Sequence, residues 1–462
     1  MFRERTRSII HGVCGTEFRE LGKLSIPLCA IYASDIGMYM IDMAVVGRLG
    51  VAELAGVAIA EQLVFLTIGV LHSVVALFVV AISNAVGEGD RERVLRLFIQ
   101  GLCITIVCGA GGMLFVWNLA SIFALLGHDG TILRIAESYS RAVMWCMIPY
   151  LLFLLARGFL AAIDSADLVF PVVVAAVALN VPLSYGFTFG ALGLPQLGVA
   201  GAGVSTSIVT CFMLCSLLRP IAKWIGADRS ILRRCRPFSA GQECFSTIKG
   251  GGRAALSTLL EDGLFVVIGA LAASLGAAPL AAHYLANSFA NLSMVFASGV
   301  GDAASIRIAV CRGRRESLSR VSSTALAIAL PPIALISVAM AFFPEHLARL
   351  FIGSSQRQGA EFLNILVPIF ILAAITQLLE GAQVVAIRAL RGLEDTTRPL
   401  LVSLTGYWVI AFPLALVLAY PVGLGIAGVW LAMMLGLAFA STMLVLRLYR
   451  LCRDPISSVR DV

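Results

Sequence analysis

Twelve apolar stretches, each of about 20 residues, recur along the whole of this 462-residue chain. Each stretch is long enough to cross a hydrocarbon core of about 30 Å as a helix. Because a bilayer offers no partners to backbone N–H and C=O groups, such runs favour helices, and they lack the period of two that barrel strands show. The sequence therefore predicts an all-α polytopic membrane protein with twelve transmembrane helices. The expected spans are residues 24–46, 54–83, 95–117, 136–160, 168–190, 198–218, 254–275, 280–308, 321–343, 361–387, 400–420 and 424–447.

The composition fits this class. Hydrophobic residues make up 59% of the chain and charged residues 13%, which is typical of a polytopic membrane protein. The charged N-terminus leads into a segment that is too long for a cleaved signal and lacks an A-x-A-like site, so we expect a retained first helix. The 11 cysteines form no C-x-x-C or Cys/His cluster, and we expect them to be small core residues, not disulfides or zinc ligands.

Basic residues are distributed unequally among the segments that join the spans. If the N-terminus lies in the cytoplasm, 29 of the 34 Lys and Arg residues fall on the cytoplasmic side. This bias predicts a multi-pass protein with both termini in the cytoplasm. Since no soluble domain is left to carry a basic face, nucleic-acid binding is not expected. The basic segment near 219–250 is expected to face anionic lipid headgroups.

The chain also repeats itself at offsets of 224 to 228 residues. The repeated pairs are AVGEGDRERV (85–94) with AVCRGRRESL (309–318), LGVAELAG (49–56) with LGAAPLAA (275–282), LGVAGAGV (197–204) with LGIAGVWL (424–431), and Asp167 and Pro171 with Asp395 and Pro399. Four matches in the same order indicate a duplicated six-helix unit. A duplication kept only for packing is the alternative, but it would leave charges inside the membrane without a purpose.

This duplication predicts two pseudo-symmetric six-helix bundles. We expect an N-terminal lobe over residues 1–218, a basic cytoplasmic linker over 219–250 and a C-terminal lobe over 251–462. Six helices return the chain to the same side of the membrane, so the lobes are parallel repeats about an axis along the membrane normal. In transporters of this design, the substrate path lies between the halves.

Three carboxylates, Asp42, Glu261 and Glu380, lie inside the long apolar stretches. A carboxylate at the middle of a bilayer costs roughly 2.5–3.5 kcal/mol on insertion scales, so such residues are normally kept because they bind a proton or a metal cation. The alternative is a carboxylate that is paired with a buried Arg or a helix end. Glu261 and Glu380, if they converge, would form either an oxygen cage for Na⁺ or a pair that shares a proton.

Several motifs in fixed order resemble one transporter family. They are MIDMAVVGRLG (40–50), LNVPLSYGF (179–187), LLEDGLFVV (259–267), AAHYLANSF (281–289), EGAQVVAIRALRGLEDTTRP (380–399) and GYWVIAFP (406–413). Over about residues 20–450 the chain resembles the multidrug and toxic compound extrusion (MATE) transporters, most of all their NorM-like branch. The resemblance implies a bacterial inner-membrane protein that exports amphipathic, often cationic compounds in exchange for Na⁺ or H⁺.

The resemblance also assigns roles to individual residues. It implies that Asp42 is the acidic residue of the first helix and that Asn180 belongs to its polar network, in which Ser184 replaces a second Asn. It further implies that Glu261 and Glu380 are the acidic pair for cation coupling, so these two are also the candidate Na⁺ ligands. Thr376 stands where some relatives have Tyr.

Further polar residues support these candidates. Asp35 precedes Asp42 by seven residues and shares its helical face about 10 Å away, which would disfavour simultaneous ionisation and suit proton pickup. An interfacial, water-exposed Asp35 is the alternative. Pro27 can bend the first helix because it removes a backbone donor, and we expect it to act as a hinge.

The remaining supporting candidates are hydrogen-bonding side chains. Asn180, Ser184 and Thr206 can hydrogen-bond Asp42 or water, although polar residues that only pack helices do the same. Asn287 and Thr376 can complete an oxygen shell beside the glutamates. His283 can relay protons or simply pack, and Glu61 and His72 in the second span are weaker candidates.

The sequence therefore predicts a secondary active antiporter for organic cations. The alternative is a flippase for lipid-linked oligosaccharides or other lipids from the same superfamily, which would need arginines for pyrophosphate, whereas these intramembrane charges are mostly acidic. An enzyme is not expected, because HExxH, GxSxG and clustered His/Asp pairs are missing from the sequence. The expected partners are small organic compounds, the coupling cation and the lipid bilayer; we expect no cofactor and a monomer.

Overall fold

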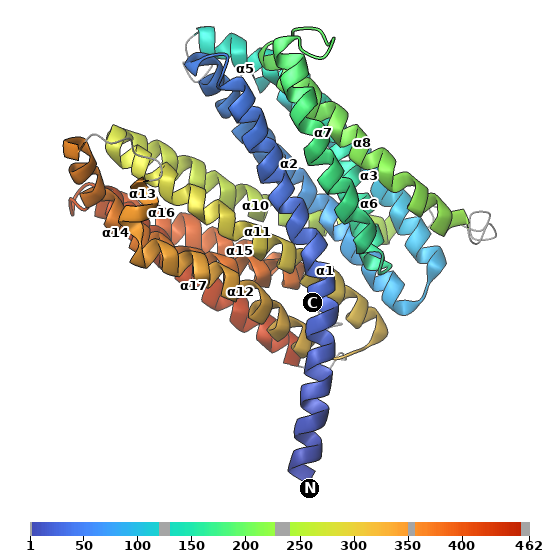
Figure 1. The fold of residues 1–462 in the computed structure, drawn as a ribbon. Helices are drawn as coiled ribbons and strands as arrows, with labels where there is room; N and C mark the ends of the chain where they lie inside the picture. Colours follow the sequence, from blue (N-terminus) through green and yellow to red (C-terminus); the bar gives the residue numbers. More distant parts are fainter. Residues whose placement is uncertain (1, 120–129, 227–240, 350–355, 454–462) are drawn as a thin grey trace. The chain divides into compact units, whose positions relative to one another are not determined.

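The computed structural model consists of helices joined by turns, and no β-strand occurs among the residues it describes. Twelve helical segments are long and apolar enough to cross a membrane, from Glu17–Val46 to Gly425–Arg453, and they coincide one by one with the predicted spans (Figure 1). The predicted fold class is therefore confirmed. The described residues are 2–119, 130–226, 241–349 and 356–453.

The helices of the first half are α1 (Phe2–Val46), α2 (Val51–Glu88), α3 (Arg91–Trp117), α5 (Gly130–Val143), α6 (Met147–Ala162), α7 (Val169–Phe189) and α8 (Val199–Gly226). A 3-10 turn, Met144–Cys146, joins α5 to α6, so these two helices form a single span.

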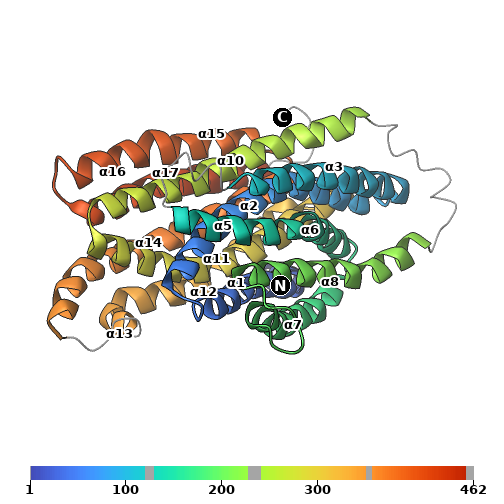
Figure 2. The same cartoon turned by 90° about the horizontal axis from the view of Figure 1, so that it is seen from above.

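The helices of the second half are α10 (Gly241–Ser274), α11 (Ala277–Arg314), α12 (Leu318–Phe342), α13 (Pro344–Arg349), α14 (Gln356–Gly392), α15 (Thr397–Ser403), α16 (Phe412–Ala419) and α17 (Gly425–Arg453). A π-helical segment, Leu404–Ala411, joins α15 to α16, and the resulting span packs along α17 (Figure 2).

The sequence repeat corresponds to the same turn in both halves. AVGEGDRERV lies between α2 and α3, and AVCRGRRESL lies between α11 and α12. Gly89 ends α2 in the left-handed conformation with φ 77°, and Arg315, 226 residues later, ends α11 with φ 59°. The glycine of the repeat, Gly313, lies two residues before Arg315, so the left-handed position falls on a non-glycine residue at a cost of roughly 1–2 kcal/mol.

The chain divides into two compact units, each packed mainly within itself. We call residues 30–255 the first-half unit and residues 1–29 with 256–462 the second-half unit. The two boundaries in the chain are 226 residues apart, which is the spacing of the repeat, and they fall inside α1 and α10. The first helix of each half therefore begins in the unit formed mainly by the other half. The lobe limits near 218 and 251 stay predictions; within the predicted linker, 219–226 lie in α8, 241–250 lie in α10 and 227–240 lie outside the described residues.

Equivalent ion pairs hold these exchanged helix ends. In α1 the Glu17 carboxylate accepts bonds of 2.9 and 3.1 Å from Nε and Nη2 of Arg307. At the position 226 residues later, the Glu243 carboxylate of α10 accepts a 2.7 Å bond from Arg93 and lies 3.7 Å from Arg96. Each exchanged end thus carries an acid that is paired with arginine from the other half of the sequence.

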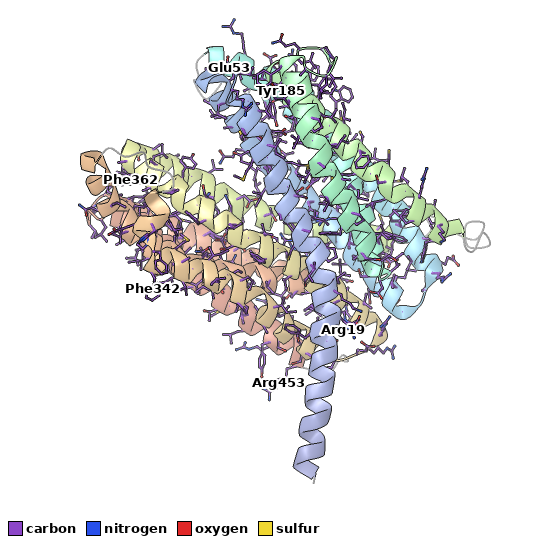
Figure 3. All side chains as sticks on the ribbon, viewed as in Figure 1. Arg19, Glu53, Tyr185, Phe342, Phe362 and Arg453 are labelled. Carbon is purple, nitrogen blue, oxygen red and sulfur yellow. The ribbon has the colours of Figure 1, made fainter. Side chains whose placement is uncertain are left out.

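Each unit has its own apolar core. The core of the first-half unit includes Val57, Tyr139 and Met147, all fully buried. The core of the second-half unit includes Phe370 and Trp430 and is formed by α10, α11, α14 and the helices around α17. Many large apolar side chains instead point outwards; Phe342, labelled in Figure 3, is 76% exposed, as expected for a surface that meets lipid.

A close helix contact gives the first prediction. A Cβ atom built at Gly299 of α11 would lie 2.6 Å from the Cα of Cys29 in α1. We expect Gly299→Ala to lower the stability of the purified protein by about 1–3 kcal/mol, because the helices must separate to admit the methyl group. Thermal unfolding in detergent measures the change.

The control is Gly252→Ala in α10, where the added methyl group meets no atom within 4 Å. This variant should be neutral or slightly more stable, because alanine favours a helix over glycine. Equal unfolding temperatures for the two variants would show that α1 does not pack tightly against α11.

Candidate functional site

Asp42 lies in α1, is 2% exposed and receives its partners from two other helices. The Thr206 hydroxyl of α8 donates to Oδ2 at 2.8 Å, and the Asn180 amide of α7 approaches Oδ1 at 3.5 Å. Asn180 also lies 3.4 Å from the Ser205 hydroxyl. The structure therefore brings together Asp42, Asn180 and Thr206, as expected from the sequence. Ser184, fully buried one turn after Asn180, lies next to Asp42, but no hydrogen bond of normal geometry joins them.

Thr206 can change partners. Its hydroxyl lies 3.1 Å from the carbonyl oxygen of Ala202 as well as 2.8 Å from Asp42. A hydroxyl has only one proton to donate, so Thr206 donates to an ionised Asp42 and can turn to Ala202 when Asp42 is protonated. The arrangement accommodates both protonation states of the carboxylate without moving a helix.

Asp35 belongs to a separate group. The Tyr150 hydroxyl of α6 donates to Asp35 at 2.7 Å, and Asp35 interacts electrostatically with Arg157. Arg157 is 3% exposed and lies over the Tyr32 ring at 5.4 Å. Asp35 thus has a phenol and a guanidinium as neighbours. Arg157 is one of the 29 Lys and Arg residues that were expected on the cytoplasmic side, whereas the structure buries it in α6.

In the second-half unit, Glu261 of α10 is held by two serines. Its Oε1 accepts bonds of 2.7 Å from Ser403 and 3.1 Å from Ser257, and the two hydroxyls lie 3.3 Å apart. Glu380 of α14 interacts electrostatically with Glu261 and with Asp262. Three carboxylates from two helices therefore act on one another. Asp262, the third of them, had no predicted role, because its position in the sequence does not show that Glu380 is a neighbour.

The arginines near this acidic cluster have partners of their own. Arg388 binds Asp302 at 2.5 Å and also donates to the carbonyl oxygen of Ser298 at 3.1 Å. Arg391 donates to the Thr258 hydroxyl at 3.2 Å. Both arginines act electrostatically on Glu261 and on Asp262. Because the direct ion pair of Arg388 is with Asp302, the cluster is not a simple buried Glu–Arg pair.

The other candidate residues of the second half make their contacts with residues outside this acidic cluster. His283 is 3% exposed and packs against Trp430 at 5.6 Å, and its Nδ1 has no hydrogen-bond partner among the described residues. Thr376 donates to the carbonyl oxygen of Leu372 in its own helix at 2.8 Å. Asn287 is half-buried one turn after His283 in α11. Roles for these residues in cation binding stay predictions.

Polar residues that had no predicted role also interact with this cluster. Gln383 donates to the Tyr407 hydroxyl at 2.7 Å, and Tyr407 interacts electrostatically with both Glu261 and Glu380. Tyr407 lies in the π-helical segment, whose Trp408 donates to the carbonyl oxygen of Leu260 at 3.0 Å. Short π-helical segments occur frequently at functional sites. The sequence signal that could have pointed to these residues was Gln383, a glutamine inside an apolar span.

These positions do not form a preassembled transition-metal centre. Among the described residues, no group of three or more His, Cys, Asp and Glu side chains is placed to hold a metal ion. A transported Na⁺ would have to use carboxylate and hydroxyl oxygens, for which Glu261 and Glu380 stay the predicted ligands.

Comparison with known proteins identifies the chain. A family model described as MatE matches residues 27–186 and 254–417, once in each half. A probable multidrug resistance protein NorM of Rhizobium meliloti is 31% identical over 444 residues, which cover 95% of this chain and 94% of that protein. A protein of the same name from Synechococcus sp. is 29% identical over 446 residues and 95% of both chains.

Solved structures share the fold. The MATE transporter VcmN of Vibrio cholerae in its bent form has a TM-score of 0.81 at 19% identity, covering 96% of this chain and 98% of that one. A MOP superfamily transporter from Pyrococcus furiosus, described as having a binding pocket of reverse polarity that suggests a different function, has a TM-score of 0.82 at 20% identity, covering 96% and 97%. The family match and the NorM relatives define the class of this chain as a membrane transporter, not an enzyme. The chain belongs to the MatE family.

The Asp42 contacts give the second prediction. We expect Thr206→Val to slow transport by about tenfold or more, because it removes a hydrogen bond to a charged group worth roughly 1.5–3 kcal/mol. Thr206→Ser restores the hydroxyl and should restore most of the rate. Efflux of a fluorescent organic cation from cells or vesicles measures it.

The matched control is Thr210→Val, one turn later in α8, where the buried hydroxyl donates only to the carbonyl oxygen of Ser207 at 2.9 Å. Thr210→Val should leave transport near the wild-type rate. If both valine variants slow transport equally, the loss reflects helix packing and the role of Thr206 at Asp42 is wrong.

Proposed function

We propose that this protein is a secondary active antiporter that exports amphipathic, cationic organic compounds in exchange for Na⁺ or H⁺. The observation that carries the proposal is the acidic cluster of Glu261, Asp262 and Glu380, whose carboxylates interact inside the membrane-spanning helices. Of the two arginines that act on Glu261 and Asp262, Arg388 is bound to Asp302 and Arg391 donates to Thr258. A site with this excess of negative charge attracts cations. The names of the NorM relatives, which describe them as probable multidrug resistance proteins, support an efflux role.

The hydroxyl groups around Glu261 suit an exchange of cations. While Glu261 is ionised, Ser257 and Ser403 can both donate to its Oε1. A proton or Na⁺ that binds the carboxylate replaces part of this interaction, and the Ser257 hydroxyl can then donate to the Ser403 hydroxyl across 3.3 Å. The bound and free states thus differ in local contacts. Such a difference is what allows a ligand to shift a conformational equilibrium.

Charge also separates this proposal from the flippase alternative. The Pyrococcus furiosus neighbour shows that the fold accommodates pockets of different polarity. Recognition of a lipid pyrophosphate would call for arginines that are free to bind phosphate oxygens. Here Arg388 is bound to Asp302 and Ser298, and Arg157 interacts with Asp35 and Tyr32. This polarity favours cationic cargo.

The same proposal includes the cellular setting. We infer a location in the bacterial inner membrane with both termini in the cytoplasm, from the excess of Lys and Arg on that side. We treat the transporter as a monomer whose partners are the organic substrate, the coupling cation and the bilayer.

The third prediction tests the coupling. Inside-out vesicles should accumulate a fluorescent organic cation under a Na⁺ gradient or under a pH gradient, applied separately. Asp42→Asn, Glu261→Gln and Glu380→Gln should each reduce the coupled flux by about tenfold or more, since each removes a carboxylate that we assign to cation binding. Glu92→Gln, which removes an exposed charge near the start of α3, is the control. Wild-type activity in all three carboxylate variants would exclude the mechanism.

The fourth prediction concerns Pro27, which lies inside α1 two residues before the boundary between the units. We propose that it acts as a hinge, because proline has no N–H group to donate a helical hydrogen bond to the carbonyl group of Lys23. Pro27→Ala should reduce transport and change the accessibility of cysteines placed along α1 to water-soluble thiol reagents. Unchanged transport together with unchanged accessibility would refute the hinge.

A further inference from the structure

One buried carboxylate of the first-half unit has no part in the proposed mechanism. Glu61 lies in the first third of α2, is only 8% exposed, and its Oε2 atom has no hydrogen-bond partner among the described residues. Its own helix surrounds it with Val57, Ala60 and Val64, which belong to the apolar core. An ionised carboxylate with an unbonded oxygen in such surroundings costs several kcal/mol. Another group must therefore compensate it, or it must carry a proton.

The groups around Glu61 are all acids or neutral. Asp42 and Tyr39 of α1, Tyr139 of α5 and Cys146 of the 3-10 turn interact with it electrostatically. Tyr139 is fully buried, and its hydroxyl also has no hydrogen-bond partner of normal geometry among the described residues. Within the described parts of the chain, no arginine or lysine is among the groups that act on Glu61, so no cationic side chain there neutralises the charge of its ionised form.

The two neighbouring carboxylates differ in their donors. Asp42 is approached by the Thr206 hydroxyl and the Asn180 amide, both of which suit an ionised carboxylate. The oxygen groups that act on Glu61 belong to Asp42, Tyr39 and Tyr139, fewer than the shell of roughly six to eight oxygen ligands that a hard cation such as Ca²⁺ takes. A proton needs no such shell, because it binds covalently to one carboxylate oxygen. Pairs of carboxylates in contrasting surroundings commonly divide acid and base roles.

We propose that Glu61 is a second proton-carrying carboxylate of the Asp42 site, which takes up and releases a proton together with Asp42 during transport. The proton passes between a carboxylate oxygen of Glu61 and one of Asp42, so that one group is protonated while the other is ionised, and no other reactant is required. When protonated, Glu61 can donate to the oxygen of Tyr139 or to Asp42. This proposal rests on the proposed antiport and deepens it, because it makes H⁺ a coupling ion of this site.

Chemical labelling of the wild-type protein tests the protonation directly. Dicyclohexylcarbodiimide modifies protonated carboxyl groups in apolar surroundings, and mass spectrometry locates the product. We expect Glu61 to be labelled at mildly acidic pH and spared at alkaline pH, with no protection by Na⁺ at constant pH. Asp42→Asn removes the negative neighbour and should lower the labelling rate at neutral pH by about tenfold. No labelling at any pH, or protection by Na⁺, would overturn the proton assignment.

Transport supplies the second test, with tetraphenylphosphonium as the probe cation in proteoliposomes. Glu61→Gln keeps the size of the side chain, and we expect it to lose the dependence of efflux on the pH gradient. Glu53→Gln removes a carboxylate from the first turn of the same helix and should behave as the wild type. A Glu61→Gln variant that keeps the wild-type pH dependence would overturn the proposal.

The two proposals fail in different ways. If the wild type shows no efflux under either gradient, the antiport is wrong, whatever Glu61 does. If the wild type is coupled and only Glu61→Gln leaves coupling unchanged, the antiport stands and the Glu61 proposal alone falls. Should Glu61→Gln fail to fold, Tyr139→Phe removes the neighbouring hydroxyl and must alter the pH dependence of Glu61 labelling for the proposal to stand.

Discussion

The structure depends on one constraint: inside the membrane, polar groups must find their partners within the protein. Many hydroxyls meet this requirement within their own helix, as Ser25 does with the carbonyl oxygen of Leu21. Fewer hydroxyls bond across helices, and some of these bonds end on carboxylates. Thr206 reaches from α8 to Asp42, and Ser403 reaches from α15 to Glu261. Where a carboxylate joins two helices in this way, a cation that binds the carboxylate can alter the contact between them.

The two units solve the problem of a buried charge differently. In the first-half unit, an amide and a hydroxyl serve Asp42 while Glu61 lies in apolar surroundings. In the second-half unit, two serines donate hydrogen bonds to Glu261, and Glu380 interacts electrostatically with two other carboxylates. The duplicated fold thus carries two unlike sites. This difference is the basis on which we propose separate positions for substrate and coupling ion.

Much of the fold could be predicted from the sequence, because a span needs only length and hydrophobicity. The functional site was harder to predict from the sequence. Asp42, Asn180 and Thr206 stood out as polar residues in apolar spans, and the structure joins them. The carboxylate that interacts with Asp42 is Glu61, whereas sequence spacing favoured Asp35. Spacing along α1 shows which residues share a face, but it contains no information about which side of α2 or α6 approaches that face.

The exchanged ends of α1 and α10 have a consequence for the order in which the protein is made. Residues 17–29 are synthesised before residues 256–462, yet they pack within the unit that those later residues form, where Glu17 meets Arg307. Until α11 has been synthesised, this end of α1 has no arginine to bind and no Gly299 to pack against. This part of α1 thus reaches its final contacts only after the second half has been made. Neither half of the sequence contains all the residues of either unit.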